Sequence, residues 1–288
     1  ISNKFKPSIN LQDDAAILPN FKKENFIISV DNFIEGIHCP SLLNPKLMII
    51  RAIFCATSDL AAMSAIPYCI FLSLTIPSKK GKKFFKNISD GIKEAISAIG
   101  IDLAGGDLTS YDGPFAISVT VVGRKKSFKK ALLRKGSSVG DYVGVTGFIG
   151  DAYIGLKILE KKTKLFNLKQ KKTAINSFLY PPQLHKFSYK LSYYAKTCID
   201  ISDGLVTDIN KLAEMANCGI NLSMDSLPLS SFAKRLLRKG DFTIKDYITA
   251  GDDYQLAFTF NKKNSKKIKN LEKKFNLKVS IIGELINR

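Results

Sequence analysis

Aspartate stands beside small or helix-capping residues at several places in this chain, and these places are the strongest candidates for chemistry. Any one of them reads as a turn or a helix start, where aspartate is common. Together, however, they hold nine of the 25 acidic residues. Several follow apolar runs that predict strands, so we expect their carboxylates to converge where neighbouring strands end. The segments are 13–16 (DDAA), 29–31 (SVD), 58–61 (SDLA), 105–107 (GGD), 200–204 (DISDG) and 251–254 (GDDY).

A cluster of carboxylates needs cations to hold it together. Two carboxylates about 4 Å apart repel by about 4 kcal/mol at an effective dielectric constant of about 20. The chain has two histidines, and its five cysteines include no C-x-x-C pair, so oxygen ligands predominate and favour Mg²⁺ over zinc. Mg²⁺ held by few carboxylates completes its shell with water and substrate phosphates. The residues therefore predict a magnesium-dependent enzyme that binds a nucleotide.

Other enzyme classes fit the sequence poorly. No G-x-x-x-x-G-K-[ST] segment is present, and Gly144, Gly147 and Gly150 do not have the spacing of a dinucleotide-binding fingerprint. The H-R-D and D-F-G signatures of protein kinases are absent. Neither His38 nor His185 lies in a motif typical of a Ser-His-Asp or Cys-His centre.

The segments that must position these aspartates alternate between strand-like and helix-like patterns, which predicts the α/β or α+β class. A strand at 101–104 is expected to break at Gly105, and Ser202 is expected to cap a helix. Strands are also expected at 26–30, 68–76, 115–122, 142–146, 198–201, 254–260 and 278–285. The other helices are expected at 45–63, after an Asn44 cap, and at 82–99 and 149–161.

A chain of 288 residues suits two domains. The basic segment 124–130 reads as a linker, so we predict an N-terminal domain at 1–124 and a C-terminal domain at 125–288. The polar segment 162–172 is expected to be mobile.

The net charge of +19 raises the question of a nucleic-acid or membrane partner. The basic runs are not interleaved with aromatics, and no nucleic-acid motif is present, so we expect a solvated lysine-rich surface and no nucleic-acid partner. No apolar run reaches the roughly 18 residues that cross a bilayer, so no membrane partner is expected. The scattered cysteines favour a reducing compartment, and we predict a cytoplasmic location.

Taken in order along nearly the whole chain, the motifs resemble those of the thiamine-monophosphate kinase family, in the aminoimidazole-ribonucleotide-synthetase-like superfamily. Segment 200–205 (DISDGL) matches the family's D-I-S-D-G-L, and 58–65 (SDLAAMSA) is close to S-D-L-A-A-M-G-A. Four further segments resemble G-D-D-A-A-V-L, T-T-D-x-L-V-E-G-x-H, G-G-D-T-T and G-E-D-Y. They are 13–18 (DDAAIL), 29–38 (SVDNFIEGIH), 105–109 (GGDLT) and 251–254 (GDDY).

The resemblance implies transfer of the γ-phosphoryl group of ATP to thiamine monophosphate, with several Mg²⁺ ions. It also implies a homodimer, in which N-terminal mixed sheets form a shared barrel, and a C-terminal α/β domain. The implied metal ligands are Asp14, Ser29, Asp31, Asp59, Asp107, Asp200 and Asp203. The implied ATP contacts are Gly106, Asp107, Arg134 and Ser202, and the implied substrate contacts are His38 and Asp252. Among all of these, Asp31, Asp107 and Asp203 are the candidate catalytic residues.

The sequence also departs from the family pattern. Val30 and Leu108 replace threonines, Asp252 replaces a longer glutamate, and Gln12 replaces a glycine. The chain ends at Arg288, before the segment that in the family brings an aromatic residue to the substrate ring. We therefore expect weaker binding of thiamine monophosphate, or an aromatic supplied from elsewhere.

Three alternatives stay open. One is a sister enzyme of the same superfamily, such as the aminoimidazole ribonucleotide or selenophosphate synthetases, although the early catalytic cysteine of the latter is missing. The others are a degenerate, inactive family member and a basic nucleic-acid-binding protein.

Overall fold

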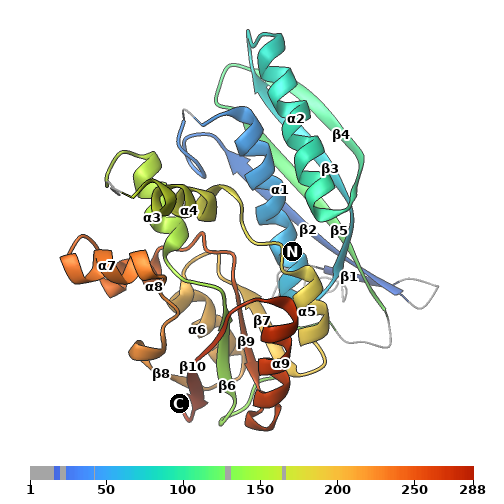
Figure 1. Cartoon of the computed structure of the whole chain (residues 1–288). Helices are drawn as coiled ribbons and strands as arrows, with labels where there is room; N and C mark the ends of the chain where they lie inside the picture. Colours follow the sequence, from blue (N-terminus) through green and yellow to red (C-terminus); the bar gives the residue numbers. More distant parts are fainter. Residues whose placement is uncertain (1–15, 20–23, 42, 127–130, 164–166) are drawn as a thin grey trace.

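The computed structural model describes residues 16–19, 24–41, 43–126, 131–163 and 167–288. In these residues the chain forms two units, each built on a five-stranded sheet with helices packed on it (Figure 1). This arrangement confirms the mixed α/β class. No described helix is both long and apolar enough to span a bilayer.

The N-terminal sheet is mixed. Its β3–β4 pair is parallel, and its other neighbouring strands are antiparallel. In spatial order the strands are β1 (Ala16–Pro19), β2 (Glu24–Ile34), β5 (Ala116–Lys126), β3 (Ile66–Pro77) and β4 (Asp102–Tyr111). Helices α1 (Pro45–Ala62) and α2 (Lys82–Ile99) lie side by side, and α1 packs on the sheet (Figure 1).

Helix α1 is the central element of the molecule. The Asn44 side chain accepts a hydrogen bond from the backbone N–H of Lys46 at 2.9 Å, and Pro45 occupies the first helical position, which confirms the predicted start. Most of its residues are buried, because one side packs on the N-terminal sheet and another contacts the C-terminal unit. Helix α2 is buried along one face, as its periodicity predicts.

The C-terminal sheet is antiparallel between all its neighbouring strands. Its order is β7 (Ala195–Asp200), β9 (Leu256–Phe260), β6 (Tyr142–Thr146), β10 (Val279–Ile286) and β8 (Gly219–Leu222). Strand β9 is buried on both faces: Phe258 and Phe260 lie in one apolar cluster and Ala257 in another. The helices are α3 (Asp151–Leu159), α4 (Leu168–Leu179), α5 (His185–Leu191), α6 (Leu205–Met215), α7 (Ser231–Lys239), α8 (Ile244–Thr249) and α9 (Ser265–Phe275), with 3₁₀ turns η2 (Met224–Ser226) and η3 (Lys262–Asn264).

Two local predictions were wrong. Strand β4 does not break at Gly105 but continues to Tyr111, because β3 pairs with it over that length and Gly106 lets the two backbones approach closely. A Cβ at Gly106 would overlap the carbonyl oxygen of Leu72. Ser202 does not cap a helix, since α6 begins at Leu205 with Gly204 at its N-cap and no side-chain cap.

Two other predictions meet the structure only in part. Strand β5 runs to Lys126, so the boundary predicted after residue 124 falls inside its last residues. The division into 1–124 and 125–288 stays a prediction. Part of the segment 162–172 belongs to α4, which begins at Leu168 after an Asn167 cap.

Candidate active site

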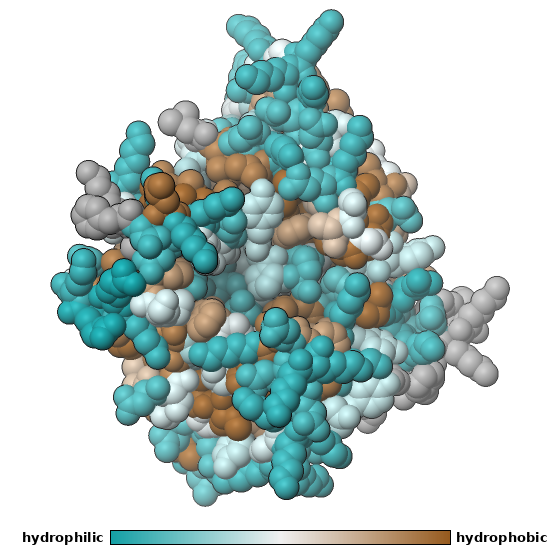
Figure 2. All heavy atoms as spheres, viewed as in Figure 1, coloured by the Kyte–Doolittle hydropathy of each residue, from teal (hydrophilic) through white to brown (hydrophobic). Residues whose placement is uncertain are grey.

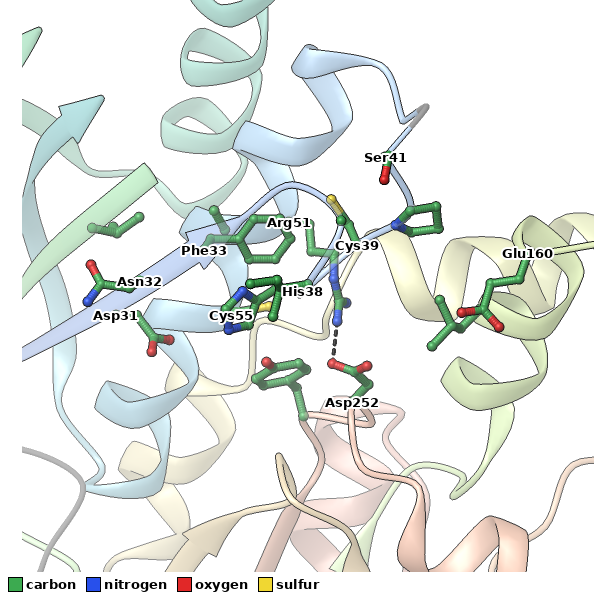
Figure 3. A pocket seen from close by; sticks show the side chains of 17 residues that line it. Asp31, Asn32, Phe33, His38, Cys39, Ser41, Arg51, Cys55, Glu160 and Asp252 are labelled. Atoms are coloured by element: carbon green, nitrogen blue, oxygen red, sulfur yellow. Dashed lines mark hydrogen bonds and ion pairs between the residues drawn. The ribbon is translucent and has the colours of Figure 1, made fainter. Parts of the chain in front are cut away.

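A pocket of about 450 Å³ lies where β2 and α1 of the N-terminal unit meet α3 and the 251–254 loop of the C-terminal unit. Figure 3 shows its side chains pointing toward one another from these separate elements. Three of the predicted site residues line it together: Asp31, His38 and Asp252. Its wall also includes Asn32, Phe33, Cys39, Ser41, Arg51, Cys55, Glu160 and Tyr254.

Asp252 is held by an arginine that sequence reasoning did not single out. Arg51 of α1 is 1% exposed. It donates one hydrogen bond to the Asp252 carboxylate and another to the carbonyl oxygen of Phe178. Its guanidinium carbon lies 3.7 Å from the centroid of the Phe178 ring. Arg51 therefore joins helix α1 to both the 251–254 loop and α4, across the two units.

The 251–254 loop has an unusual backbone. Gly251, Asp252 and Tyr254 have φ angles of 71°, 64° and 47°, in the left-handed region. A Cβ at position 251 would overlap the carbonyl oxygen of Ser202, so this position requires glycine. The N–H groups of Asp252 and Tyr254 donate to the carbonyl oxygens of Ser202 and Ile201 at 3.0 and 2.8 Å. The G-D-D-Y motif is thus a strained loop fixed against the end of β7, as is common at functional sites.

His38 lies in the turn after β2, between Asp31 and Arg51 in Figure 3. Its Nδ1 accepts a hydrogen bond from the Ile34 N–H at 3.0 Å, and its ring lies 5.6 Å from the Phe33 ring. Because Nδ1 is the acceptor, Nε2 carries the proton of the neutral ring and can donate into the pocket.

Asp31 is half-buried on β2. Burial raises the pKa of its carboxyl, and nearby His38 acts in the opposite direction. The Cys55 thiol in the same wall is inert as a nucleophile, since burial raises its pKa to about 12. The groups that the pocket offers for chemistry therefore include carboxylate oxygens and an imidazole, and they do not include the Cys55 thiol.

Outside the pocket wall, hydrogen bonds of two serines involve three predicted metal ligands: Ser29, Asp59 and Asp200. Ser29 Oγ of β2 donates to the Asp59 carboxylate, and Ser58 Oγ donates to Asp200 Oδ2 at 2.8 Å. The consecutive residues Ser58 and Asp59 of α1 thereby contact strands of both units. Yet no three histidine, cysteine or acidic side chains in the described residues are grouped closely enough to hold one ion. Asp14 lies outside the described residues.

Asp31 and Asp107 face opposite sides of the N-terminal sheet. Residues paired across neighbouring strands share a face, and successive residues of a strand alternate. Asp31 pairs through Val119 and Leu72 with Gly106, a row whose buried members face the helices. Asp107 belongs to the next row and is exposed. One chain therefore does not bring these two predicted catalytic residues together.

The remaining predicted residues lie along the C-terminal unit. Asp203 is exposed and pairs with Lys211 at 2.7 Å, and the same lysine pairs with Asp208. Ser202 is half-buried beside the 251–254 loop. Arg134 is half-buried and follows Leu133, whose carbonyl oxygen accepts from the Cys198 N–H at 3.2 Å. None of the three predicted residues Asp203, Ser202 and Arg134 lines the pocket around His38.

Sequence reasoning missed Arg51, Tyr254 and Glu160 as pocket residues. Arg51 did leave a signal, because it is a cation inside the apolar helical run 47–56. A buried cation needs a carboxylate or carbonyl partner. Glu160 has no such signal in the sequence, because its place at the pocket depends on how α3 packs in the fold.

Comparison with known proteins agrees with this architecture. Residues 12–125 match the AIR synthase related protein, N-terminal domain, and residues 139–288 match the corresponding C-terminal domain. Thiamine-monophosphate kinase of Buchnera aphidicola subsp. Schizaphis graminum is 34% identical over 275 residues, which cover 94% of this chain and 82% of that protein.

Two solved structures extend the comparison. The structure of AaThiL complexed with AMPPCP and TMP has a TM-score of 0.85 at 27% identity, over 96% of this chain and 85% of that one. Thiamine-monophosphate kinase from Stenotrophomonas maltophilia K279a has a TM-score of 0.85 at 28% identity, over 96% and 87%. This chain therefore belongs to the AIR synthase related protein family and, within it, to the thiamine-monophosphate kinases.

Proposed function

We propose that this chain transfers the γ-phosphoryl group of ATP to thiamine monophosphate, giving thiamine diphosphate and ADP, in the biosynthesis of thiamine diphosphate. One observation carries the assignment to this pocket: Asp31 and the two predicted substrate contacts, His38 and Asp252, line the same cavity. Asp31 and His38 come from the N-terminal unit, whereas Asp252 comes from a distant part of the sequence in the C-terminal unit.

The chemistry suits the residues at hand. The acceptor phosphate is already an anionic nucleophile, so the reaction needs alignment and charge neutralisation more than a strong base. His38 Nε2 can donate to a substrate oxygen, and the fixed 251–254 loop can orient the substrate through Asp252. Asp31 is the proposed catalytic residue of this pocket.

Magnesium is part of the proposal. The donor chemistry suits it. The Ser29 hydroxyl, Asp59 and Asp200 supply hard oxygen atoms at the junction of β2, α1 and β7, and Asp31 supplies another on β2, although the described residues group no three acidic side chains around one point. Mg²⁺ would neutralise phosphate charge between two anionic substrates. The proposed ligands are Asp14, Ser29, Asp31, Asp59, Asp107, Asp200 and Asp203, with Asp107 and Asp203 also catalytic.

A homodimer is proposed to complete the site. Among the described residues, the face of the N-terminal sheet that carries Asp107 is uncovered, and Val30 and Phe71 on this face are 60% and 43% exposed. An apolar sheet face of this kind is typical of a protein–protein interface. Pairing two such faces as a barrel would cover these side chains. It would also place Gly106 and Asp107, with Arg134 and Ser202 of the C-terminal unit, to bind ATP.

No nucleic-acid partner is proposed. Hydrophilic side chains are spread widely over the face seen in Figure 2, with apolar patches between them, and they do not form one continuous stripe. A cytoplasmic location is proposed because all five cysteines are free thiols, which suits a reducing compartment.

The test is to incubate the chain with ATP, Mg²⁺ and thiamine monophosphate and to separate the products by chromatography. Thiamine diphosphate and ADP should appear in equal amounts and should depend on all three components. Unphosphorylated thiamine serves as the control acceptor and should give no product. ATP hydrolysis without thiamine diphosphate would overturn the proposal.

A further inference from the structure

Arg51 is the most deeply buried cation in the wall of the pocket, and the proposed transfer of the phosphoryl group does not itself require it. An ion pair buried in this way rarely adds more stability than an apolar pair of the same size. Its Nε–H also has no acceptor among the described residues, which is unfavourable for a buried donor. Stability alone is therefore a poor reason for an arginine at this position.

The contacts of Arg51 instead concern the geometry of one carboxylate. Asp252 has a left-handed backbone, and its side chain is a third exposed at the pocket. Arg51 reaches that carboxylate from the opposite unit, while its second bond to the Phe178 carbonyl and the Phe178 ring fix the guanidinium plane. A planar guanidinium held at two points constrains its partner more tightly than a lysine would.

We infer that Arg51 is a positioning residue for thiamine monophosphate: it sets the orientation of Asp252 and couples that orientation to the packing of the two units. This inference rests on the proposed function of the pocket. Arg51 acts through Asp252 rather than by touching the reacting atoms, because its own side chain is almost completely buried. Loss of Arg51 should therefore weaken binding of thiamine monophosphate and leave ATP binding largely unchanged.

The test is a double-mutant cycle on the full chain with Arg51→Met, Asp252→Asn and the double variant. Arg51→Met should raise the KM for thiamine monophosphate by about tenfold or more and change the KM for ATP by less than about twofold. The KM of the double variant for thiamine monophosphate should be little higher than that of the more impaired single variant. Arg51→Lys should recover part of the loss, because an ammonium keeps the ion pair without the second bond.

Lys269→Met is the matched control, since the exposed Lys269 side chain pairs with Glu272 at 2.7 Å on α9 and neither residue lines the pocket. It should leave both KM values unchanged. The inference is wrong if Arg51→Met raises the KM values for thiamine monophosphate and ATP by the same factor. It is also wrong if the fold-changes in KM of the two single variants multiply in the double variant.

A measurement without substrate separates this inference from the proposed function. In urea unfolding, each variant changes the unfolding equilibrium constant by a certain factor. The product of the factors for the two single variants should exceed the factor for the double variant by about fivefold or more. If they simply multiply, Arg51 and Asp252 do not act as a pair and the inference fails. A different outcome is that Arg51 and Asp252 are coupled but the unaltered chain makes no thiamine diphosphate. In that case the proposed function and the positioning role are both wrong, and only the contact between the two units is supported.

Discussion

Asp31 combines partial burial with a place in the pocket wall, and this combination gives the first prediction. Asp31→Asn keeps the shape of the side chain and removes its charge. We expect kcat to fall by about 100-fold or more, because charge neutralisation at the phosphates is the main catalytic task. Steady-state kinetics measures this, with circular dichroism to verify folding. Asp225→Asn, on the exposed turn η2, is the control, and full activity of Asp31→Asn would contradict the assignment.

Asp151 and Asp253 give a prediction on pH. Burial raises the pKa of Asp151 from 3.8 to about 7, and it raises that of Asp253 well above 3.8. A carboxyl whose pKa is raised by folding stabilises the fold fully below its unfolded pKa and loses that contribution as the pH rises. Between about pH 4 and pH 7 the Asp151 contribution should therefore decline, by on the order of a few kcal/mol.

Asp151→Asn checks this directly. The Asn side chain can still accept the hydrogen bond that Ser230 Oγ donates to Asp151 Oδ1 at 2.7 Å. Urea unfolding across this pH range should show a smaller loss of unfolding free energy in the variant than in the unaltered chain. An identical pH dependence in the two proteins would mean that Asp151 is not protonated in the fold.

The residues around the pocket were predictable from the sequence only in part. Asp31, His38 and Asp252 were predicted from motifs, and the structure places all three around one pocket. Their assigned roles stay predictions. The pairing of Arg51 with Asp252 was not predictable, because it joins residues 201 positions apart through the packing of two units.

At the scale of elements, the 251–254 loop depends on glycine at its first position. Gly251→Ala combines a left-handed φ with an overlap against the Ser202 carbonyl. We expect it to lower the unfolding free energy by roughly 2–4 kcal/mol and to weaken substrate binding through Asp252. Urea unfolding and the KM for thiamine monophosphate measure the two effects.

Gly240 offers a matched control for this prediction. It has a φ of 76° at the end of α7, but a Cβ there would meet nothing within 4 Å. Gly240→Ala should therefore cost about 1 kcal/mol and leave the KM unchanged. Equal costs for the two variants would show that the Ser202 contact does not constrain the loop.

Elements with a strong period were predictable, and those set by neighbouring strands were not. Helix 82–99 and strand 142–146 were predicted with the bounds that the structure has, because their apolar patterns are regular. Strand β4 was cut short in the prediction, since Gly105 and Gly106 usually mark a turn and here serve close pairing with β3. Ser202 was taken for a cap, but its carbonyl instead accepts from the 251–254 loop.

At the scale of the whole molecule, the open face of the N-terminal sheet predicts self-association. Phe71→Glu places a charge on this face without touching the pocket around His38. We expect sedimentation velocity to show a dimer for the unaltered chain and a monomer for the variant, because burying the charge is costly. Activity should fall with the dimer if Asp107 acts across the interface.

Leu168→Glu is the control for the dimer, since Leu168 is 80% exposed at the start of α4. It should leave the dimer intact. A monomeric unaltered chain with full activity would contradict the completion of the site by a second copy.

The most direct test of the central claim follows the phosphorus atom. With ATP labelled at the γ-phosphorus and unlabelled thiamine monophosphate, the label should appear in the terminal phosphate of thiamine diphosphate, with unlabelled ADP as the other product. This result is required for direct transfer to a phosphate acceptor. Label released only as inorganic phosphate, or found in ADP, would contradict the account.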